Sequence, residues 1–239
     1  MLCRFCRINP PSLNAHIIPQ SFFVEHADKR YPSQQITDLE NVFPKSRPIG
    51  VYDSGILCEA CEREFSTADD YGYRFFHPSV DYSLCTDGQG TCAYRIEKVD
   101  YDKLKRFLLS VLWRASVSTQ EFYAGVDLGP YEEKIRKLLQ NGEVGPPDDY
   151  SIYIERFDYP SSLIPILCPT LVRDDVNMYM FVLNGYLVHI KVDNRLLPSE
   201  LRGLMLCPNA PLQIPQVPYR GSQEYELMQK VRRDAYKRA

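Results

Sequence analysis

Long hydrophobic runs are missing from this sequence, and its first residues lack the basic-then-apolar pattern of a secretory signal. A membrane-spanning helix requires about 20 mostly apolar residues, so no membrane segment is predicted and we expect a cytoplasmic protein. An excess of positive charge is missing as well, because the net charge is −3 at pH 7. This balance excludes a protein that coats nucleic acid with its whole surface, although it allows a local basic patch.

Cysteine is present but too sparse for a disulfide framework, because eight cysteines are spread over 239 residues. Four of them form two CxxC pairs, Cys3 with Cys6 and Cys58 with Cys61. Zinc accepts four thiolates in a closed tetrahedral shell, so these residues predict one structural zinc ion. The alternative is four unrelated core thiols, which rarely show paired CxxC spacing. A closed shell leaves the zinc no open position for chemistry.

The two pairs lie in a proline-rich first third of the chain, which reads as a loop-rich segment with little core of its own. Such a segment needs a staple, and a bound metal supplies one. We therefore divide the chain into a zinc-stapled module at 1–78 and a larger body at 79–239.

Helical periodicity in the body predicts helices near 101–116 and 130–140. The second begins at Pro130 and is followed by Asn141-Gly142, a pattern typical of a helix start and stop. In the first, four basic residues are expected on a solvent-exposed face: Lys103, Lys105, Arg106 and Arg114. The tail of the chain predicts a further amphipathic helix.

Strands are predicted near 151–157, 177–183 and 186–192, and Asn184-Gly185 between the last two is a strong hairpin signal. The proline-rich stretch 193–219 is expected to be irregular. A zinc module, a helical middle and an antiparallel hairpin or sheet together predict an α+β fold.

A closed zinc shell cannot take part in a reaction, so any catalytic group must lie beside it. Three residues are close enough to the cysteine pairs in sequence to do so. His16 follows the first CxxC pair, Asp53 precedes the second pair, and Glu62 follows Cys61 directly. A histidine base with a carboxylate partner, plus a carboxylate that binds a metal, are the parts needed to activate water against a phosphodiester.

The same residues carry a family resemblance. Their order is Cys3-x2-Cys6, then His16-Ile-Ile-Pro19, then Asp53-x4-Cys58-x2-Cys61-Glu62. Over roughly the first 75 residues, this order resembles the HNH endonucleases, whose ββα-metal site is often built on a zinc-stabilised treble clef. The resemblance implies that His16 is the general base, that Asp53 orients it and that Glu62 binds a catalytic Mg²⁺ or Mn²⁺. It further implies a DNA substrate and a role in bacterial defence. The rest of the chain is similar to an uncharacterised bacterial family, and that similarity says nothing about activity.

Three positions depart from the pattern of that family. Ala15 stands where an acidic residue or a second histidine usually binds the metal, Asp53 replaces an asparagine, and Glu62 replaces a histidine or asparagine. Asp69 or Asp70 would supply a missing carboxylate if their helix turned inward, and both also suit surface or capping positions. A packed His16 and a Glu62 that merely favours the positive end of a helix are the structural alternatives.

Two classes of function follow from these observations. The first is a metal-dependent endonuclease whose DNA contacts come from local positive charge at Arg4, Arg7, Lys103, Lys105, Arg106, Arg232, Arg233, Lys237 and Arg238. The alternative is a catalytically inactive treble-clef module that binds nucleic acid or a protein partner. The sequence does not specify an oligomeric state.

Overall fold

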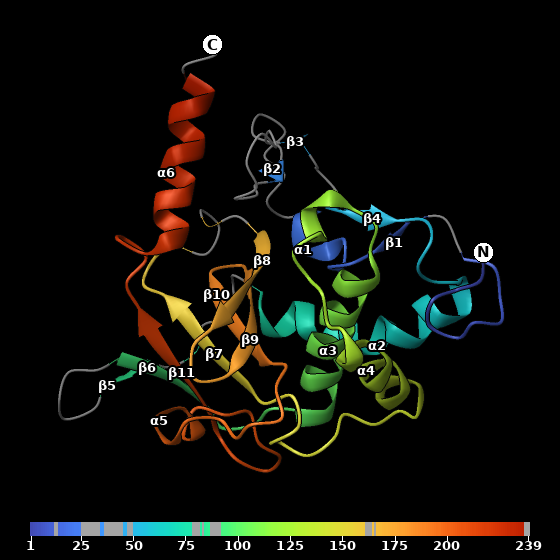
Figure 1. Cartoon of the computed structure of the whole chain (residues 1–239). Helices are drawn as coiled ribbons and strands as arrows, with labels where there is room; N and C mark the ends of the chain where they lie inside the picture. Colours follow the sequence, from blue (N-terminus) through green and yellow to red (C-terminus); the bar gives the residue numbers. More distant parts are fainter. Residues whose placement is uncertain are drawn as a thin grey trace.

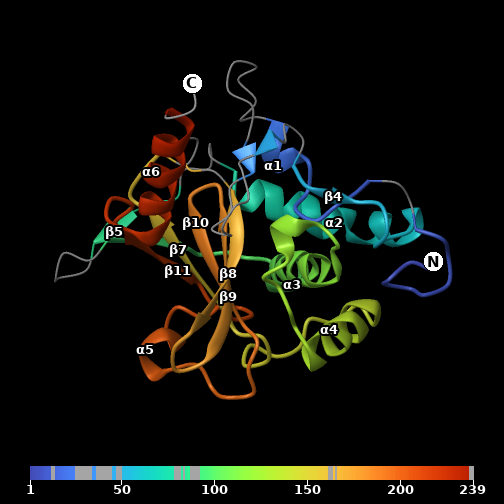
Figure 2. The same cartoon turned by 45° about the horizontal axis from the view of Figure 1, so that its top comes forward.

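The computed structural model describes residues 1–11, 14–24, 34–35, 45–46, 50–77, 82, 84–86, 92–160, 164 and 166–236. Within them the chain forms six α-helices and a seven-stranded mixed sheet, which confirms the α+β class. Figures 1 and 2 show the sheet on one side of the molecule and three long helices on the other: α2 (Glu59–Phe75), α3 (Tyr101–Val117) and α4 (Pro130–Gln140).

Short elements precede α2 in the chain. Strand β1 (Ala15–His16) pairs antiparallel with β4 (Tyr52–Asp53), α1 is Ser21–Val24, and β2 (Gln34–Gln35) pairs with β3 (Lys45–Ser46). Cys58 is the N-cap residue of α2, so the second CxxC pair occupies the start of this helix. Glu59 and Glu62 lie in its first turn, where acidic side chains interact favourably with the positive end of the helix dipole.

The helices predicted near 101–116 and 130–140 correspond to α3 and α4. The side chain of Asp100 caps α3 by accepting a hydrogen bond of 3.1 Å from the backbone N–H of Lys103. Helix α4 begins at Pro130, whose missing N–H costs nothing in the first turn. A short 3₁₀ helix, Glu121–Tyr123, lies between the two.

The seven-stranded sheet has the order β5-β6-β11-β7-β10-β9-β8. Its strands are β5 (Leu84–Thr86), β6 (Cys92–Ile96), β7 (Ile152–Phe157), β8 (Leu167–Arg173), β9 (Asn177–Leu183), β10 (Tyr186–Lys191) and β11 (Leu212–Val217). Neighbours are antiparallel except β11 and β7, which are parallel. The prediction of an antiparallel sheet is therefore wrong for the pair of β11 and β7. After β10 the chain passes through α5 (Ser199–Arg202) and adds β11 on the side of β7 opposite to β10, where it runs parallel to β7.

The strands predicted near 151–157, 177–183 and 186–192 correspond to β7, β9 and β10. Asn184 and Gly185 have φ angles of 48° and 79°, the left-handed conformation that a two-residue hairpin turn requires. The stretch 193–219 is not irregular throughout, because it contains α5 and β11. Pro215 lies within β11 and obscures the strand in the sequence, since proline lacks the N–H that a ladder uses.

The predicted tail helix is α6 (Gln223–Tyr236), and Figure 1 shows its C-terminal end projecting away from the sheet. Its first half packs on the body through Met228, which is buried, and through Tyr225, whose ring meets that of Tyr219 at 5.5 Å. Lys237 and Arg238, two of the predicted DNA-contacting residues, lie outside the described residues.

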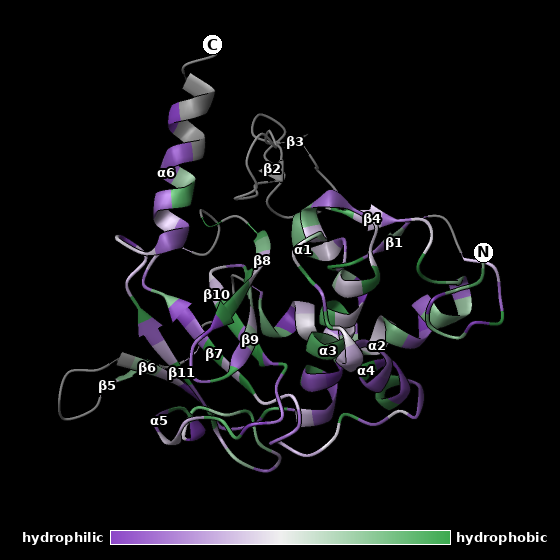
Figure 3. Ribbon diagram, viewed as in Figure 1, coloured by the Kyte–Doolittle hydropathy of each residue, from purple (hydrophilic) through white to green (hydrophobic). Residues whose placement is uncertain are grey.

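One hydrophobic core joins the two predicted segments of the chain. Phe5 and Phe65 pack with Trp113 of α3, and the same cluster continues to Ile190 and Ile214 in the sheet. Figure 3 shows hydrophobic residues along α3 and on β8 and β9, and hydrophilic ones on α6. Among the described residues, no helix is both long enough and apolar enough to cross a membrane.

Candidate metal centre

The four cysteines of the two CxxC pairs form one cluster. The Sγ atoms of Cys3, Cys6, Cys58 and Cys61 all lie within 4.8 Å of one another, and every one of these residues except Cys6 is buried. A tetrahedral zinc with Zn–S bonds of 2.3 Å places its sulfur atoms about 3.8 Å apart. The Cys6 and Cys58 Sγ atoms are 3.8 Å apart, so the cluster is compatible with a structural zinc ion.

The first pair lies in a tight loop, the knuckle, which we define as residues 3–9. The backbone N–H of Cys3 donates to the Asn9 carbonyl at 2.8 Å, and the N–H of Arg7 donates to the Cys3 carbonyl at 2.9 Å. Arg7 has a positive φ of 58°, which closes this turn. The side-chain amide of Asn9 lies 3.8 Å from the Cys58 Sγ and donates to it, so the knuckle also reaches the second pair.

Cys6 and Cys61 differ in how well their surroundings stabilise an ionised thiol. Desolvation raises the pKa of Cys6, but backbone hydrogen bonds from Asn9 and Ile8 outweigh it and lower that pKa to about 7. Burial is the main cause of a raised pKa at Cys61, and the neighbouring thiol of Cys58 raises this pKa further. A buried thiolate at Cys61 therefore needs a cation, which a coordinated metal supplies.

His16 lies on β1, which follows the first CxxC pair in the sequence and pairs with β4. The register places His16 opposite Tyr52, with ring centroids 5.9 Å apart in an edge-on arrangement. Asp53 lies opposite Ala15, so the register directs the side chains at positions 16 and 53 to opposite faces of the strand pair. The backbone carbonyl of His16 accepts a hydrogen bond of 3.0 Å from the guanidinium of Arg114.

Asp53 is buried and ties β4 to the end of α3. Its Oδ1 accepts from the N–H of Gly55 at 2.9 Å. Its Oδ2 accepts from the N–H and hydroxyl of Thr119 at 2.7 and 2.8 Å, and from the hydroxyl of Ser118 at 3.2 Å. Burial raises the pKa of Asp53, but these hydrogen bonds outweigh that effect and lower the pKa. The carboxylate is therefore ionised and anchors the chain after α3, and its orienting role toward His16 stays a prediction.

The other predicted carboxylates lie along α2. Glu62 is half-buried in the first turn, where its N–H donates to the Cys58 carbonyl at 3.0 Å. Asp70 is exposed. Both oxygens of Asp69 accept from Arg114, at 2.7 and 3.0 Å, so this carboxylate is already paired. Burial raises the pKa of Asp69, and the guanidinium opposes that rise.

Two basic residues of α3 that were expected in solvent are buried. Lys105 is 1% exposed and Arg114 is 2% exposed. The Lys105 ammonium donates to the carbonyls of Pro146 and Asp149, both at 2.7 Å, and desolvation lowers its pKa to about 8. The expectation failed because other elements cover α3 on the faces that its own periodicity marks as polar.

Compared with models of protein families, with curated proteins and with solved structures, the chain matches none of them. The candidate centre is therefore defined by its own side chains. Sequence spacing found the four cysteines, whereas the hydrogen-bond donors Arg114, Ser118 and Thr119 carried no local signal that could have identified them.

Proposed function

We propose that the chain is a metal-dependent, HNH-like endonuclease that hydrolyses DNA phosphodiester bonds. The single observation that carries the proposal is the way the four cysteines assemble. A cysteine knuckle, a short antiparallel strand pair and a helix that starts at the second CxxC pair follow one another along the chain. These are the parts of a zinc-stapled treble clef, the scaffold on which many ββα-metal sites are built, and His16 lies on its strand pair.

In the proposed reaction, His16 removes a proton from the attacking water. Glu62 is the ligand proposed for a divalent ion, because a carboxylate oxygen suits Mg²⁺ or Mn²⁺. When bound, such an ion supplies Lewis-acid stabilisation of the charge that develops on the phosphoryl oxygens. Asp53 is proposed to orient His16 indirectly, through the position of β4, because the register directs the two side chains to opposite faces of the strand pair. The Asp53 carboxylate already accepts hydrogen bonds from Gly55, Ser118 and Thr119. The zinc ion has a scaffold role, since four thiolates complete its shell.

DNA is the proposed substrate, and fewer basic groups are available to contact it than the sequence suggested. Lys105 is buried, Arg7 pairs with Glu133 at 2.6 Å, and Arg106 pairs with Glu64 at 3.1 Å. Arg4 of the knuckle and Arg233 on α6 are exposed. Their contribution should appear as DNA affinity that falls with rising salt, because phosphate contacts release counterions.

The test is a plasmid nicking assay with Mg²⁺ or Mn²⁺, carried out on variants whose zinc content is measured in the same preparations. His16→Ala is expected to keep its zinc and lose cleavage, because the four cysteines complete the zinc shell without it. His77→Ala is the matched control. His77 follows the opposite end of α2, and a 17-residue helix is about 25 Å long. Cleavage that survives in His16→Ala would refute the assignment of the base.

A second function is favoured by two specific observations. Ala15 removes a metal ligand that the family usually has, and the carboxylate of Asp53 already accepts four hydrogen bonds. Both fit a treble clef that binds nucleic acid or a protein partner without cleaving it. This alternative predicts no cleavage by the wild type with any divalent ion, and it predicts that His16→Ala affects stability alone.

A further inference from the structure

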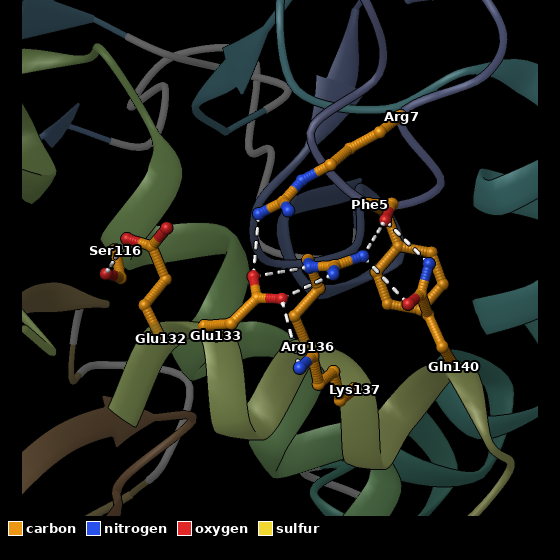
Figure 4. Close-up of polar contacts among 8 residues, drawn as sticks. All are labelled: Phe5, Arg7, Ser116, Glu132, Glu133, Arg136, Lys137 and Gln140. Atoms are coloured by element: carbon orange, nitrogen blue, oxygen red, sulfur yellow. Dashed lines mark hydrogen bonds and ion pairs between the residues drawn. The ribbon is translucent and has the colours of Figure 1, made fainter. Parts of the chain in front are cut away.

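The knuckle is held by a helix that lies far from it in the sequence. The backbone carbonyl of Phe5, between Cys3 and Cys6, accepts two hydrogen bonds from α4 (Figure 4). One comes from the Nη1 of Arg136 and the other from the Nε2 of Gln140, both at 2.7 Å. The donors lie 131 and 135 residues from Phe5.

Arg136 is itself locked in place. Its Nε and Nη2 donate to the two carboxylate oxygens of Glu133 at 2.8 and 2.6 Å, and its Nη1 also donates to the Gln140 side chain at 2.8 Å. Arg7 of the knuckle reaches back to Glu133 at 2.6 Å. A guanidinium fork held this way has little rotational freedom left, so its contact with Phe5 is well defined.

The knuckle is also anchored through the Phe5 side chain. The ring is 1% exposed and packs edge-on against Phe65 of α2 at 4.9 Å and against Trp113 of α3 at 5.3 Å. The ring and the carbonyl of one residue therefore fix the loop between the first two cysteines from opposite directions. Neither contact involves a metal ion.

Helix α4 is a firm support for these contacts because it is tied to α3. The hydroxyl of Ser116 donates to Glu132 at 3.1 Å, a contact visible in Figure 4. The Nη1 of Arg106 donates to the carbonyl of Leu139 at 2.8 Å, close to the C-terminal end of α4. Movement of α4 relative to α3 would break these contacts as well as those with Phe5.

We infer that Arg136 and Gln140 are positioning residues for the metal centre, and that α4 sets its metal affinity by holding the Cys3–Cys6 knuckle in the ligating conformation. A site that is already ordered loses less conformational entropy when it binds its ion. Groups that orient metal ligands without touching the metal typically account for 10- to 100-fold in affinity. The inference concerns metal binding and does not require that the chain cleave DNA.

The experiment measures Zn²⁺ affinity by competition with a chelator, using the full chain, together with the visible spectrum of the Co²⁺-loaded protein. The variants are Arg136→Met and Gln140→Met, which keep much of each side chain and remove the donors to Phe5. The control is Lys137→Met on the same helix, because Lys137 is 68% exposed and meets the network at its edge, through a contact of 4.0 Å with Glu133 that adds little in solvent.

Arg136→Met is expected to weaken zinc binding by roughly 10- to 100-fold and to change the Co²⁺ bands, with a smaller loss in Gln140→Met and no change in Lys137→Met. Circular dichroism checks that each variant is folded at the temperature used. If Arg136 and Gln140 only stabilised the fold, their removal would lower the melting temperature and leave the zinc affinity of the folded protein unchanged. If Arg136→Met does not fold, Gln140→Met decides the question. A folded variant with wild-type affinity and Co²⁺ spectrum would overturn the inference, as would a wild type that binds neither ion.

Discussion

Arg114 and Asp69 form a bidentate ion pair that joins α3 to α2, with N–O distances of 2.7 and 3.0 Å. The side chain of Arg114 is 3% exposed and that of Asp69 is 17% exposed. The same guanidinium also donates to the His16 carbonyl, so one buried cation connects both helices to the strand that carries the proposed base.

Removing one partner of this pair should therefore be costly. Arg114→Met is expected to lower the free energy of unfolding by about 3–5 kcal/mol, because it leaves the Asp69 carboxylate buried without its counter-charge. Urea denaturation measures the change. The exposed pair of Arg63 with Glu59 is the control, and Arg63→Met should cost less than about 1 kcal/mol. An Arg114→Met/Asp69→Leu double variant should recover part of the loss, since neither charge then remains.

The cysteine cluster predicts one zinc ion per chain. Cys58→Ser is expected to abolish zinc binding and to destabilise the N-terminal segment, because the binding free energy of a structural zinc contributes to folding. Elemental analysis measures the metal, and thermal unfolding with and without a strong chelator measures the stability. Cys85→Ser is the matched control, since Cys85 is exposed and lies outside the cluster. Full zinc content in Cys58→Ser would show that the ligand set is wrong.

Asp53 allows a test at acid pH. Its folded-state pKa is lowered, so its ionised form contributes stability that is fully present above the unfolded-state pKa of about 3.9 and is lost as the pH falls toward the folded-state value. Asp53→Asn should therefore be less stable than the wild type at neutral pH, and the difference should shrink below about pH 4. Denaturant unfolding across this range checks the prediction, and a difference independent of pH would contradict it.

The role of Asp53 in orienting His16 needs a separate readout. If Asp53 acts on His16, Asp53→Asn should reduce cleavage by roughly 100-fold under conditions where the variant is still folded and keeps its zinc. A Ser118→Ala/Thr119→Val variant removes the two hydroxyl donors to the same carboxylate and leaves Asp53 in place. If that variant loses as much cleavage as Asp53→Asn, the effect comes from the anchoring of the chain after α3.

Lys105 allows a second pH test, at alkaline pH, where stability is again expected to rise with pH. Desolvation lowers its folded-state pKa to about 8 from an ordinary value of 10.5, so the unfolded chain holds more protons between these values. Wild-type stability relative to Lys105→Met should therefore rise as the pH increases from about 8 to about 10. Comparing the two proteins cancels the titration of the tyrosines and thiols. A constant difference in unfolding free energy over this range would show that Lys105 stays charged in the folded state.

Several features follow from local sequence pattern because their causes are local. The CxxC spacing brings two thiols together within one turn of chain, and Pro130 and Asn141-Gly142 mark the ends of α4 through backbone preferences. Asn184-Gly185 specifies its hairpin for the same reason, since the turn requires two positive φ angles. None of these features depends on what the rest of the chain does.

Tertiary structure alone decided which polar groups are buried and which strands are neighbours. Lys105 and Arg114 occupy positions on α3 that a surface helix would expose, and they are buried because α2, α4 and the segment after α4 cover them. The parallel pairing of β11 with β7 and the hydrogen bonds from α4 to Phe5 join residues more than 50 positions apart. Local pattern identified the four clustered cysteines, the helices α3, α4 and α6, and the strands β7, β9 and β10. The packing of distant elements determined what holds those cysteines, because burial and hydrogen-bond partners depend on contacts that a local pattern does not encode.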